Sequence, residues 1–110
     1  MDKRVKAKWV KALRSGKYKQ GRGALKTKNG YCCLGVLCDL HSREVNKKPA
    51  FEDTTEYLEA SGLLPDEVKE WAGLTQGEGN PQLGKHSATH HNDTNRRTFK
   101  QIADRIEKYL

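Results

Sequence analysis

The amino-acid sequence predicts an α+β fold: a small single domain, residues 1–110, with about four helices packed around a central buried helix and a short antiparallel β-hairpin. The chain has 110 residues, of which 35% are hydrophobic, and this suits one domain with one modest core. A dense apolar run at residues 31–40 stands out from a very polar chain and predicts the buried centre. Apolar residues also recur at helical spacing near both ends, with a glycine-rich stretch and an Asn-Gly pair between them.

The first helix is predicted over residues 2–15. Its apolar residues recur at helical spacing, and lysines and arginines fill most of the remaining positions. The apolar positions are Val5, Trp9, Ala12 and Leu13. Asp2 is suited to cap the N-terminus of this helix, and the Ser15-Gly16 pair is a stop signal.

Residues 17–30 are rich in glycine and lysine and show no helical period. A short hairpin is predicted where residues 24–27 and 31–32 flank the Asn29-Gly30 pair. Asn-Gly is the most favourable two-residue hairpin turn, because both residues tolerate positive φ.

The central helix is predicted over residues 33–44. Its apolar side chains cover so much of the circumference that the helix should be buried on most sides. They are Cys33, Leu34, Val36, Leu37, Cys38 and Leu40, with His41 on the same stripe. Gly35 inside this helix costs about 1 kcal/mol relative to alanine, and this predicts that another backbone packs closely against it.

The second half of the chain begins with a polar connection at residues 45–51, followed by residues 54–61, which are ambiguous between strand and helix. Pro65 is predicted as the first residue of a short helix, since proline is pre-organised for that position. Gly73 is predicted to cap its C-terminus.

Residues 74–95 are predicted as a loop, in which Gln82-Leu83 could form a short edge strand. The clearest helix of the chain follows over residues 98–110. Thr98 and Gln101 have the spacing of a capping box at its start, and the helix has a regular apolar face.

Charge is distributed very unevenly along the chain. The net charge is +7, but residues 1–28 contain eleven lysines and arginines against one acid, a net of +10. Residues 29–80 sum to −6 and residues 81–110 to +3. If the two basic ends meet in the fold, they form a positive field suited to phosphates. The alternative is that this charge mainly solvates helix faces.

The cysteine and hydropathy patterns predict a soluble cytoplasmic protein. There are three cysteines, an odd number, and adjacent Cys32 and Cys33 are poorly placed to bridge each other. The N-terminal stretch is charged rather than signal-like, and no apolar run approaches the roughly 20 residues of a membrane span.

Two catalytic or metal-binding alternatives involve the cysteines and histidines. Cys38-x-x-His41 could pair with ligands among His86, His90 and His91, but the usual zinc spacing is missing. A cysteine nucleophile would need partial exposure, whereas the neighbours here are apolar. No enzyme activity, metal or cofactor is therefore expected.

The predicted ligand site centres on the glycine-rich loop. Its glycines would let backbone N–H groups approach an anion, and its cations would neutralise phosphates. Lys19, Arg22 and Lys26 are the phosphate candidates, Tyr18 could stack on a base, and Gln20, Asn92 and Asp93 could read polar edges. Arg96 and Arg97, beside the last helix, could extend the same patch. The alternatives are a flexible solvated loop and an ordinary turn at residues 90–95.

Several stretches form a distinctive set that covers most of the chain. They read Trp9-Val10-x-Ala12-Leu13-Arg14-Ser15-Gly16-x-Tyr18-x-Gln20-Gly21, Tyr31-Cys32-Cys33-Leu34-Gly35-Val36-Leu37-Cys38-Asp39-Leu40, Leu64-Pro65-x-x-Val68-x-x-Trp71-Ala72-Gly73-Leu74, Asn92-Asp93 and Phe99-x-x-Ile102-Ala103-Asp104-x-Ile106-Glu107. With them the chain resembles a widespread family of small, mostly uncharacterised bacteriophage proteins. It departs from that pattern at His91, where the family has leucine, and in the glycine-rich stretch 76–84. The histidine is either a local ligand contact or a harmless surface change.

The resemblance implies a phage origin and action in the host cytoplasm, and it carries over no catalytic residue. From size, charge and the lack of catalytic motifs we expect a homo-oligomeric sponge for a cyclic nucleotide or an ADP-ribose-type immune signal. Such a protein would antagonise host defence without catalysis. Two alternatives stay open: a nucleic-acid-binding protein that lays its first helix along phosphates, and an inhibitor that binds a host protein through the acidic residues 52–70.

Overall fold

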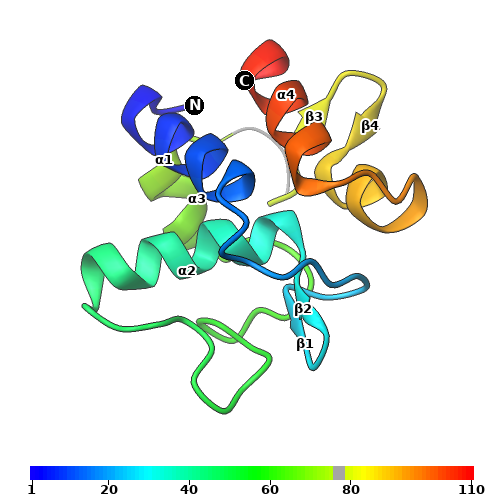
Figure 1. Cartoon of the computed structure of the whole chain (residues 1–110). Helices are drawn as coiled ribbons and strands as arrows, with labels where there is room; N and C mark the ends of the chain where they lie inside the picture. Colours follow the sequence, from blue (N-terminus) through cyan, green and yellow to red (C-terminus); the bar gives the residue numbers. More distant parts are fainter. Residues whose placement is uncertain (76–78) are drawn as a thin grey trace.

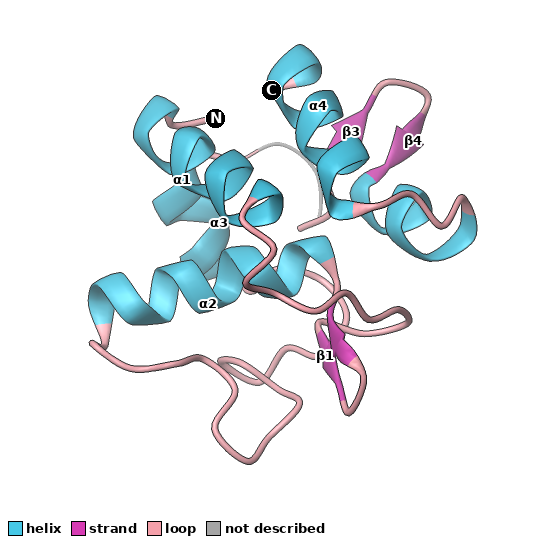
Figure 2. Cartoon of the chain, viewed as in Figure 1, coloured by secondary structure: helices cyan, strands magenta, loops and turns pink. Residues whose placement is uncertain are grey.

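The computed structural model describes residues 1–75 and 79–110. In chain order the elements are α1 (Lys3–Arg14), β1 (Lys26–Thr27), β2 (Gly30–Tyr31), α2 (Cys33–Val45), α3 (Asp66–Ala72), β3 (Gln82–Leu83), β4 (His86–Ser87), the π-helical turn η1 (His90–Thr94) and α4 (Phe99–Tyr109). Figure 1 shows α2 below α1 and α4, with α3 behind, and Figure 2 shows how little strand there is beside the helices. The predicted α+β fold, with a central helix and a short antiparallel hairpin, is confirmed.

Burial of α2 on nearly all sides makes it the centre of the core. Every residue from Cys33 to Asp39 is buried. Trp9 of α1 packs against the start of this helix, and its indole Nε1 donates to the carbonyl oxygen of Cys33 at 2.9 Å. A Cβ added at Gly35 would collide with the backbone carbonyl group of Leu25, because it would lie only 2.8 Å from the carbonyl carbon. The close backbone approach predicted at this glycine is therefore confirmed.

α1 and α4 pack side by side and bring the two basic ends of the chain together (Figure 1). Arg14 donates to Asp104 at 2.6 Å and to Glu107 at 2.7 Å, and Lys6 Nζ donates to the carbonyl oxygen of Glu107 at 3.2 Å. The predicted N-cap Asp2 accepts from the backbone N–H of Val5. The capping box predicted at the start of α4 is also present. The two basic ends of the chain therefore do meet in the fold, as a positive field for phosphates requires.

The first hairpin forms one residue earlier than predicted. Lys26 pairs with Tyr31 and Thr27 with Gly30, so Lys28 and Asn29 make the turn and Gly30 belongs to β2. A Cβ at Gly30 would lie 2.7 Å from the carbonyl carbon of Lys19, in the loop that packs on this strand. The glycine is thus needed for packing, and this requirement overrides the local preference for an Asn-Gly turn.

The second half of the chain departs from prediction at three places. Pro65 is the N-cap residue of α3 rather than its first helical residue, although Gly73 does end the helix in the left-handed conformation, with φ +69°. The predicted strand Gln82–Leu83 forms, but with a partner, His86–Ser87, that was not predicted. The predicted turn after it is the π-helical η1. These segments are too short for periodicity to reveal them. Residues 76–78 of the unusual stretch 76–84 lie outside the described residues.

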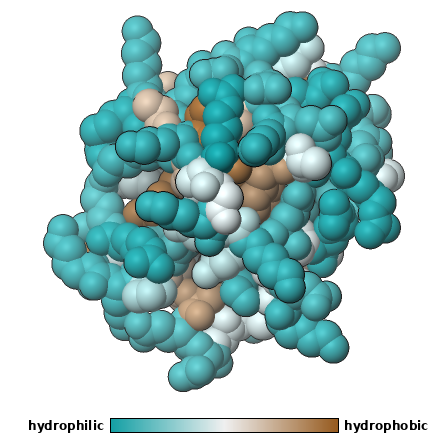
Figure 3. Space-filling view, viewed as in Figure 1, coloured by the Kyte–Doolittle hydropathy of each residue, from teal (hydrophilic) through white to brown (hydrophobic). Residues whose placement is uncertain are grey.

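Residues 54–61, which the sequence left between strand and helix, form neither. Tyr57 and Ala60 make a two-residue antiparallel bridge. None of the helices described in residues 1–75 and 79–110 has the length and apolar character that crossing a bilayer requires. The face of the molecule shown in Figure 3 is mostly hydrophilic, with small hydrophobic areas near its middle.

Glu44 joins three helices at one carboxylate. Its oxygens accept from Arg4 at 2.6 Å, Lys8 at 2.9 Å and Trp71 Nε1 at 2.7 Å. The hydrogen bond from Arg4, with those from Trp71 and Lys8, holds the pKa of Glu44 well below its usual range. The site therefore links α1 and α3 to the C-terminal end of α2.

We expect Glu44→Gln to lower the free energy of unfolding by about 1 kcal/mol at pH 7, because solvent screens surface ion pairs. The folded-state pKa of Glu44 lies below the unfolded value of about 4.3, so its contribution is complete above that pH and is lost as the pH falls below it. Urea unfolding at pH 7 and pH 3 measures both effects. Glu70→Gln, at an exposed carboxylate on α3, is the control. An equal loss at the two pH values would contradict the assignment.

Candidate anion-binding site

Asn92 in η1 holds together the predicted ligand loop and the start of α2. The side chain is fully buried. Its Oδ1 accepts from Gln20 Nε2 at 2.8 Å and from the backbone N–H of Cys33 at 3.3 Å. Its Nδ2 donates to the carbonyl oxygen of Gly21 at 2.9 Å and to Asp93 at 2.8 Å. These four bonds use the full capacity of an amide, so in this structure Asn92 positions the loop rather than presents a free polar edge. Asp93 is half-buried and accepts from Asn92 through Oδ1.

Two arginines are oriented by η1 from opposite ends of the chain. Arg22 Nε donates to the carbonyl oxygen of Asn92, and Arg97 Nε donates to His91 Nδ1, each at 3.1 Å. Gln20 connects the two sides, because its Nε2 also donates to the carbonyl oxygen of Arg97 at 2.9 Å. Among the residues that the structure describes, neither arginine forms an ion pair with a carboxylate. Both guanidinium groups are thus held through Nε while their outer nitrogens remain available.

The neutral imidazole of His91 fixes the orientation of Arg97. Its Nδ1 must accept, because Arg97 Nε can only donate, and its Nε2 therefore carries the proton and donates to the carbonyl oxygen of Leu83 at 3.0 Å. Burial lowers the pKa of His91, and the cationic Arg105 and Arg97 act in the same direction. The surface alternative offered for His91 is wrong, since the residue is 1% exposed.

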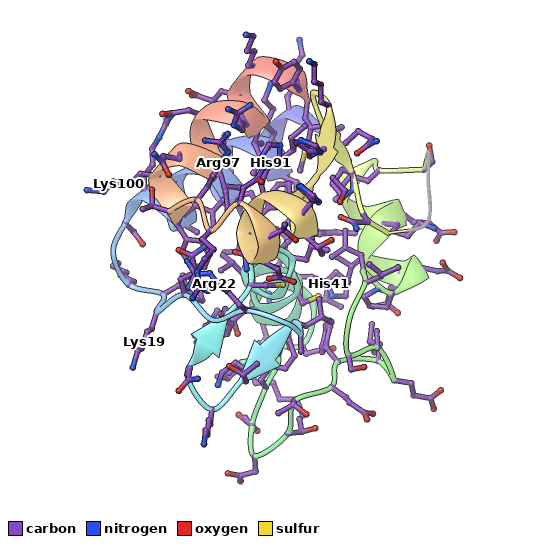
Figure 4. The ribbon with its side chains drawn as sticks, turned by 90° about the vertical axis from the view of Figure 1, so that its right-hand side faces the viewer. Lys19, Arg22, His41, His91, Arg97 and Lys100 are labelled. Atoms are coloured by element: carbon purple, nitrogen blue, oxygen red, sulfur yellow. The ribbon has the colours of Figure 1, made fainter. Side chains whose placement is uncertain are left out.

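Further cations surround the two arginines. Lys19 and Arg96 are exposed, and Arg96 has φ +53°, which turns the chain between η1 and α4. Lys100, in the first turn of α4, was not predicted. A cation opposes the helix dipole at this end of a helix, and that unfavourable placement is the signal that could have identified it. Figure 4 shows Lys19, Arg22, Arg97 and Lys100 on one side of the molecule. We call Arg22 and Arg97, together with Lys19, Arg96 and Lys100, the arginine site.

Tyr18 lies beside the arginine site but is committed to contacts within the chain. Its hydroxyl donates to Asp39, and its ring packs edge-on against Tyr31 with centroids 5.0 Å apart. Burial raises the pKa of Tyr18, and the hydrogen bond to Asp39 acts the same way. Asp39 is itself fully buried and also accepts from Arg43 at 2.7 Å. Tyr18 therefore anchors the loop to α2, and its stacking on a base stays a prediction.

Lys26 lies on the hairpin, in β1, and its side chain has partners within the hairpin. Its Nζ donates to the carbonyl oxygen of Thr27 at 2.7 Å and lies 5.2 Å from the centroid of the Tyr31 ring. The ligand residues predicted from the sequence thus divide into two groups. Gln20, Arg22 and Asp93 form hydrogen bonds with Asn92, and Gln20 also bonds to Arg97. Lys26 instead contacts Thr27 and Tyr31.

The three cysteines are buried and unpaired. Burial raises the pKa of Cys32 to about 11, and it raises those of Cys33 and Cys38 as well. A thiol that stays protonated at neutral pH is a poor nucleophile. No group of three or more His, Cys, Asp or Glu side chains in residues 1–75 and 79–110 is arranged to hold a metal ion.

Comparison with known families matches residues 1–110 to the model of a domain of unknown function, DUF8296. The chain belongs to this family. No curated protein and no solved structure matches this DUF8296 protein.

Proposed function

We propose that this DUF8296 protein binds a phosphorylated small molecule at the arginine site without chemical conversion. The expected ligand is a cyclic nucleotide or an ADP-ribose-type signal, whose sequestration would antagonise host defence. The resemblance to bacteriophage proteins supports this setting and the host cytoplasm as its location. A homo-oligomer remains part of the proposal.

The observation that carries the proposal is the pair Arg22 and Arg97. A guanidinium held through Nε presents its outer nitrogens in a fixed fork, which matches two oxygens of a phosphate. Since no described carboxylate pairs with either group, an anionic ligand displaces no internal ion pair. Lys19, Arg96 and Lys100 would add longer-range attraction.

A second candidate function, nucleic-acid binding, is favoured by the cations that line the groove along α1, which are Lys3, Lys6, Lys11, Arg14 and Lys17. α1 carries a row of lysines that continues into the loop towards Lys19, and an extended polyanion could follow it. Binding of that kind weakens steeply as salt rises, whereas paired arginine forks in a shaped site keep more of their affinity.

We expect Arg22→Ala and Arg97→Ala each to weaken binding of a phosphorylated ligand about 10- to 100-fold, because each removes a charge-assisted pair of hydrogen bonds. Thermal-shift screening at two salt concentrations should first identify the ligand among cyclic dinucleotides, cyclic trinucleotides and ADP-ribose derivatives. Calorimetry then measures the dissociation constants of the variants.

The matched control is Lys48→Ala, which removes one exposed cation after the C-terminal end of α2, whereas Asn92 holds the N-terminal end. It should leave affinity unchanged. Arg22→Lys separates charge from geometry: it should recover only part of the loss, since an ammonium cannot form the fork. Shifts seen only with duplex DNA or single-stranded RNA, and lost at high salt, would favour the second function. Unchanged affinity in both arginine variants would overturn the site.

A further inference from the structure

A strained turn protrudes from the connection between α2 and α3. Tyr57 and Ala60 exchange two backbone hydrogen bonds of 2.9 Å, so Leu58 and Glu59 form a two-residue turn. Both have positive φ, +50° and +68°, where Asn and Gly are strongly preferred. A leucine in this conformation is a clear outlier, and its side chain is 45% exposed. Backbone strain that places an apolar side chain in solvent suggests a contact surface.

The turn is held firmly at its base. Tyr57 is 6% exposed, and its hydroxyl lies 2.6 Å from Nδ1 of buried His41 and accepts from Asn46 at 3.2 Å. His41 Nε2 in turn lies 3.1 Å from the carboxylate of Glu67 on α3. The turn is therefore presented by a rigid base on α2 and α3.

The chain on both sides of the turn carries only acidic charge, although Lys26 and Lys28 of the first hairpin line the same depression as Asp53. Residues 49–68 contain no lysine or arginine. Glu52, Asp53, Glu56 and Glu59 are exposed and form no ion pair within the described part of the chain. Leu58 thus lies between carboxylates, and residues 56–59 are called the acidic tip below.

A groove of opposite charge runs between α1 and α4. It has a volume of about 780 Å³. The groove is lined by Lys3, Lys6, Ala7, Val10, Lys11, Arg14, Ser15, Lys17 and Glu107. Its only carboxylate, Glu107, is already paired with Arg14. The groove therefore has an apolar floor, Ala7 and Val10, surrounded by lysines that give it a net positive charge. We call it the basic groove.

We propose that the acidic tip of one copy of this chain binds in the basic groove of a second copy. Leu58 would cover the apolar floor at Val10, and Glu56 and Glu59 would meet the lysines at the rim. The chemistry of each surface matches the other: one apolar side chain between two carboxylates, and one apolar floor between lysines. The arginine site is not part of this contact, so the proposal is independent of the ligand.

The two surfaces lie at opposite ends of the molecule. Figure 1 shows α1 and α4 at the top and the connection between α2 and α3 at the bottom. A contact between different surfaces is head-to-tail, and it closes into a ring or continues as a chain. The area buried by one turn in one groove is small, because a stable interface buries about 1,200–2,000 Å² of surface. The association should therefore be weak, concentration-dependent and reduced by salt.

The first test replaces the strained pair by the preferred turn residues, Leu58→Asn with Glu59→Gly. We expect the melting temperature to rise by at least about 4 °C, because the positive-φ strain is relieved. Self-association, measured by sedimentation velocity over a concentration series at low salt, should be lost. Leu63→Ser is the matched control, since Leu63 is a comparably exposed leucine of the same connection, at 41%.

The second test uses charge reversal. Glu59→Lys and Lys11→Glu should each weaken self-association about tenfold or more. An equimolar mixture should recover it, because the intact tip of the Lys11→Glu protein fits the intact groove of the Glu59→Lys protein. Recovery in the mixture supports the proposal. A monomer at every concentration, association that survives both tip variants, or a larger species removed by nuclease would each overturn it.

Discussion

Gly35→Ala is expected to destabilise this protein more than any other single methyl group added to it, by more than about 4 kcal/mol. The added Cβ would meet the backbone carbonyl group of Leu25 at the centre of the core. That carbonyl cannot move aside, because it accepts from the N–H of Cys32 at 3.1 Å while the N–H of Leu25 donates to Ser61 at 2.7 Å. Urea unfolding followed by tryptophan fluorescence measures the loss, since Trp9 reports on the same core.

Gly62→Ala is the matched control for this prediction. A Cβ at Gly62 meets no heavy atom within 4 Å, so its effect should stay within about 0.5 kcal/mol. If Gly35→Ala unfolded at nearly the same urea concentration as the parent protein, the close packing of Leu25 on α2 would be contradicted. Complete loss of a cooperative transition agrees with the prediction.

Asn92→Ala is expected to cost about 3 kcal/mol or more and to disorder the arginine site. Truncation leaves the backbone N–H of Cys33 and the carbonyl oxygen of Gly21 without their partner in the interior, and each unpaired group costs about 1–3 kcal/mol. The change also removes the bond that positions Gln20. Thermal and urea unfolding measure the stability, and ligand titration measures the site.

Asn95→Ala, at the exposed residue just after η1, is the control and should be nearly neutral. A variant of Asn92 that kept both its stability and its ligand affinity would show that the four hydrogen bonds are not a joint support. Loss of affinity in a variant that still unfolds cooperatively would show that Asn92 acts on the arginine site through position.

Long periodic segments were predicted well from the sequence. The helices at both ends and in the centre formed close to their predicted bounds, because each contains its own apolar face. The two end helices also have their predicted N-caps, Asp2 and Thr98. Gly35 was interpreted correctly as a close approach, since a glycine inside a helix has a cost that packing must compensate. Its partner, Leu25, was not predictable, because nothing local relates the two positions.

The short elements were predicted less well, and tertiary contacts explain why. Gly30 was assigned to a turn from its neighbour Asn29, but the loop at Lys19 needs the glycine in a strand. The strand at His86–Ser87 and the turn η1 are too short to show a period. In such segments the backbone follows whichever partners the rest of the fold provides.

The candidate site was predicted as a set of residue types and not as a geometry. The sequence named Arg22 and Arg97, which the structure brings to adjacent residues of η1. It assigned Asn92 to a ligand, whereas burial commits all four bonds of this amide to the chain itself. It also grouped Lys26 with the loop, and the structure places the Lys26 side chain on the ring of Tyr31. Its contact with a phosphate stays a prediction.

Local chemistry along the chain was enough to specify the α+β class, the three long helices with their ends, and the concentration of positive charge at both termini. These depend on side-chain period, capping and composition, which neighbours in sequence decide. The packing of α1 on α4, the tie through Asn92 and the orientation of the two arginines depend on residues far apart in sequence. Only the folded chain brings such residues within hydrogen-bonding distance, and there burial determines which polar groups stay free for a ligand.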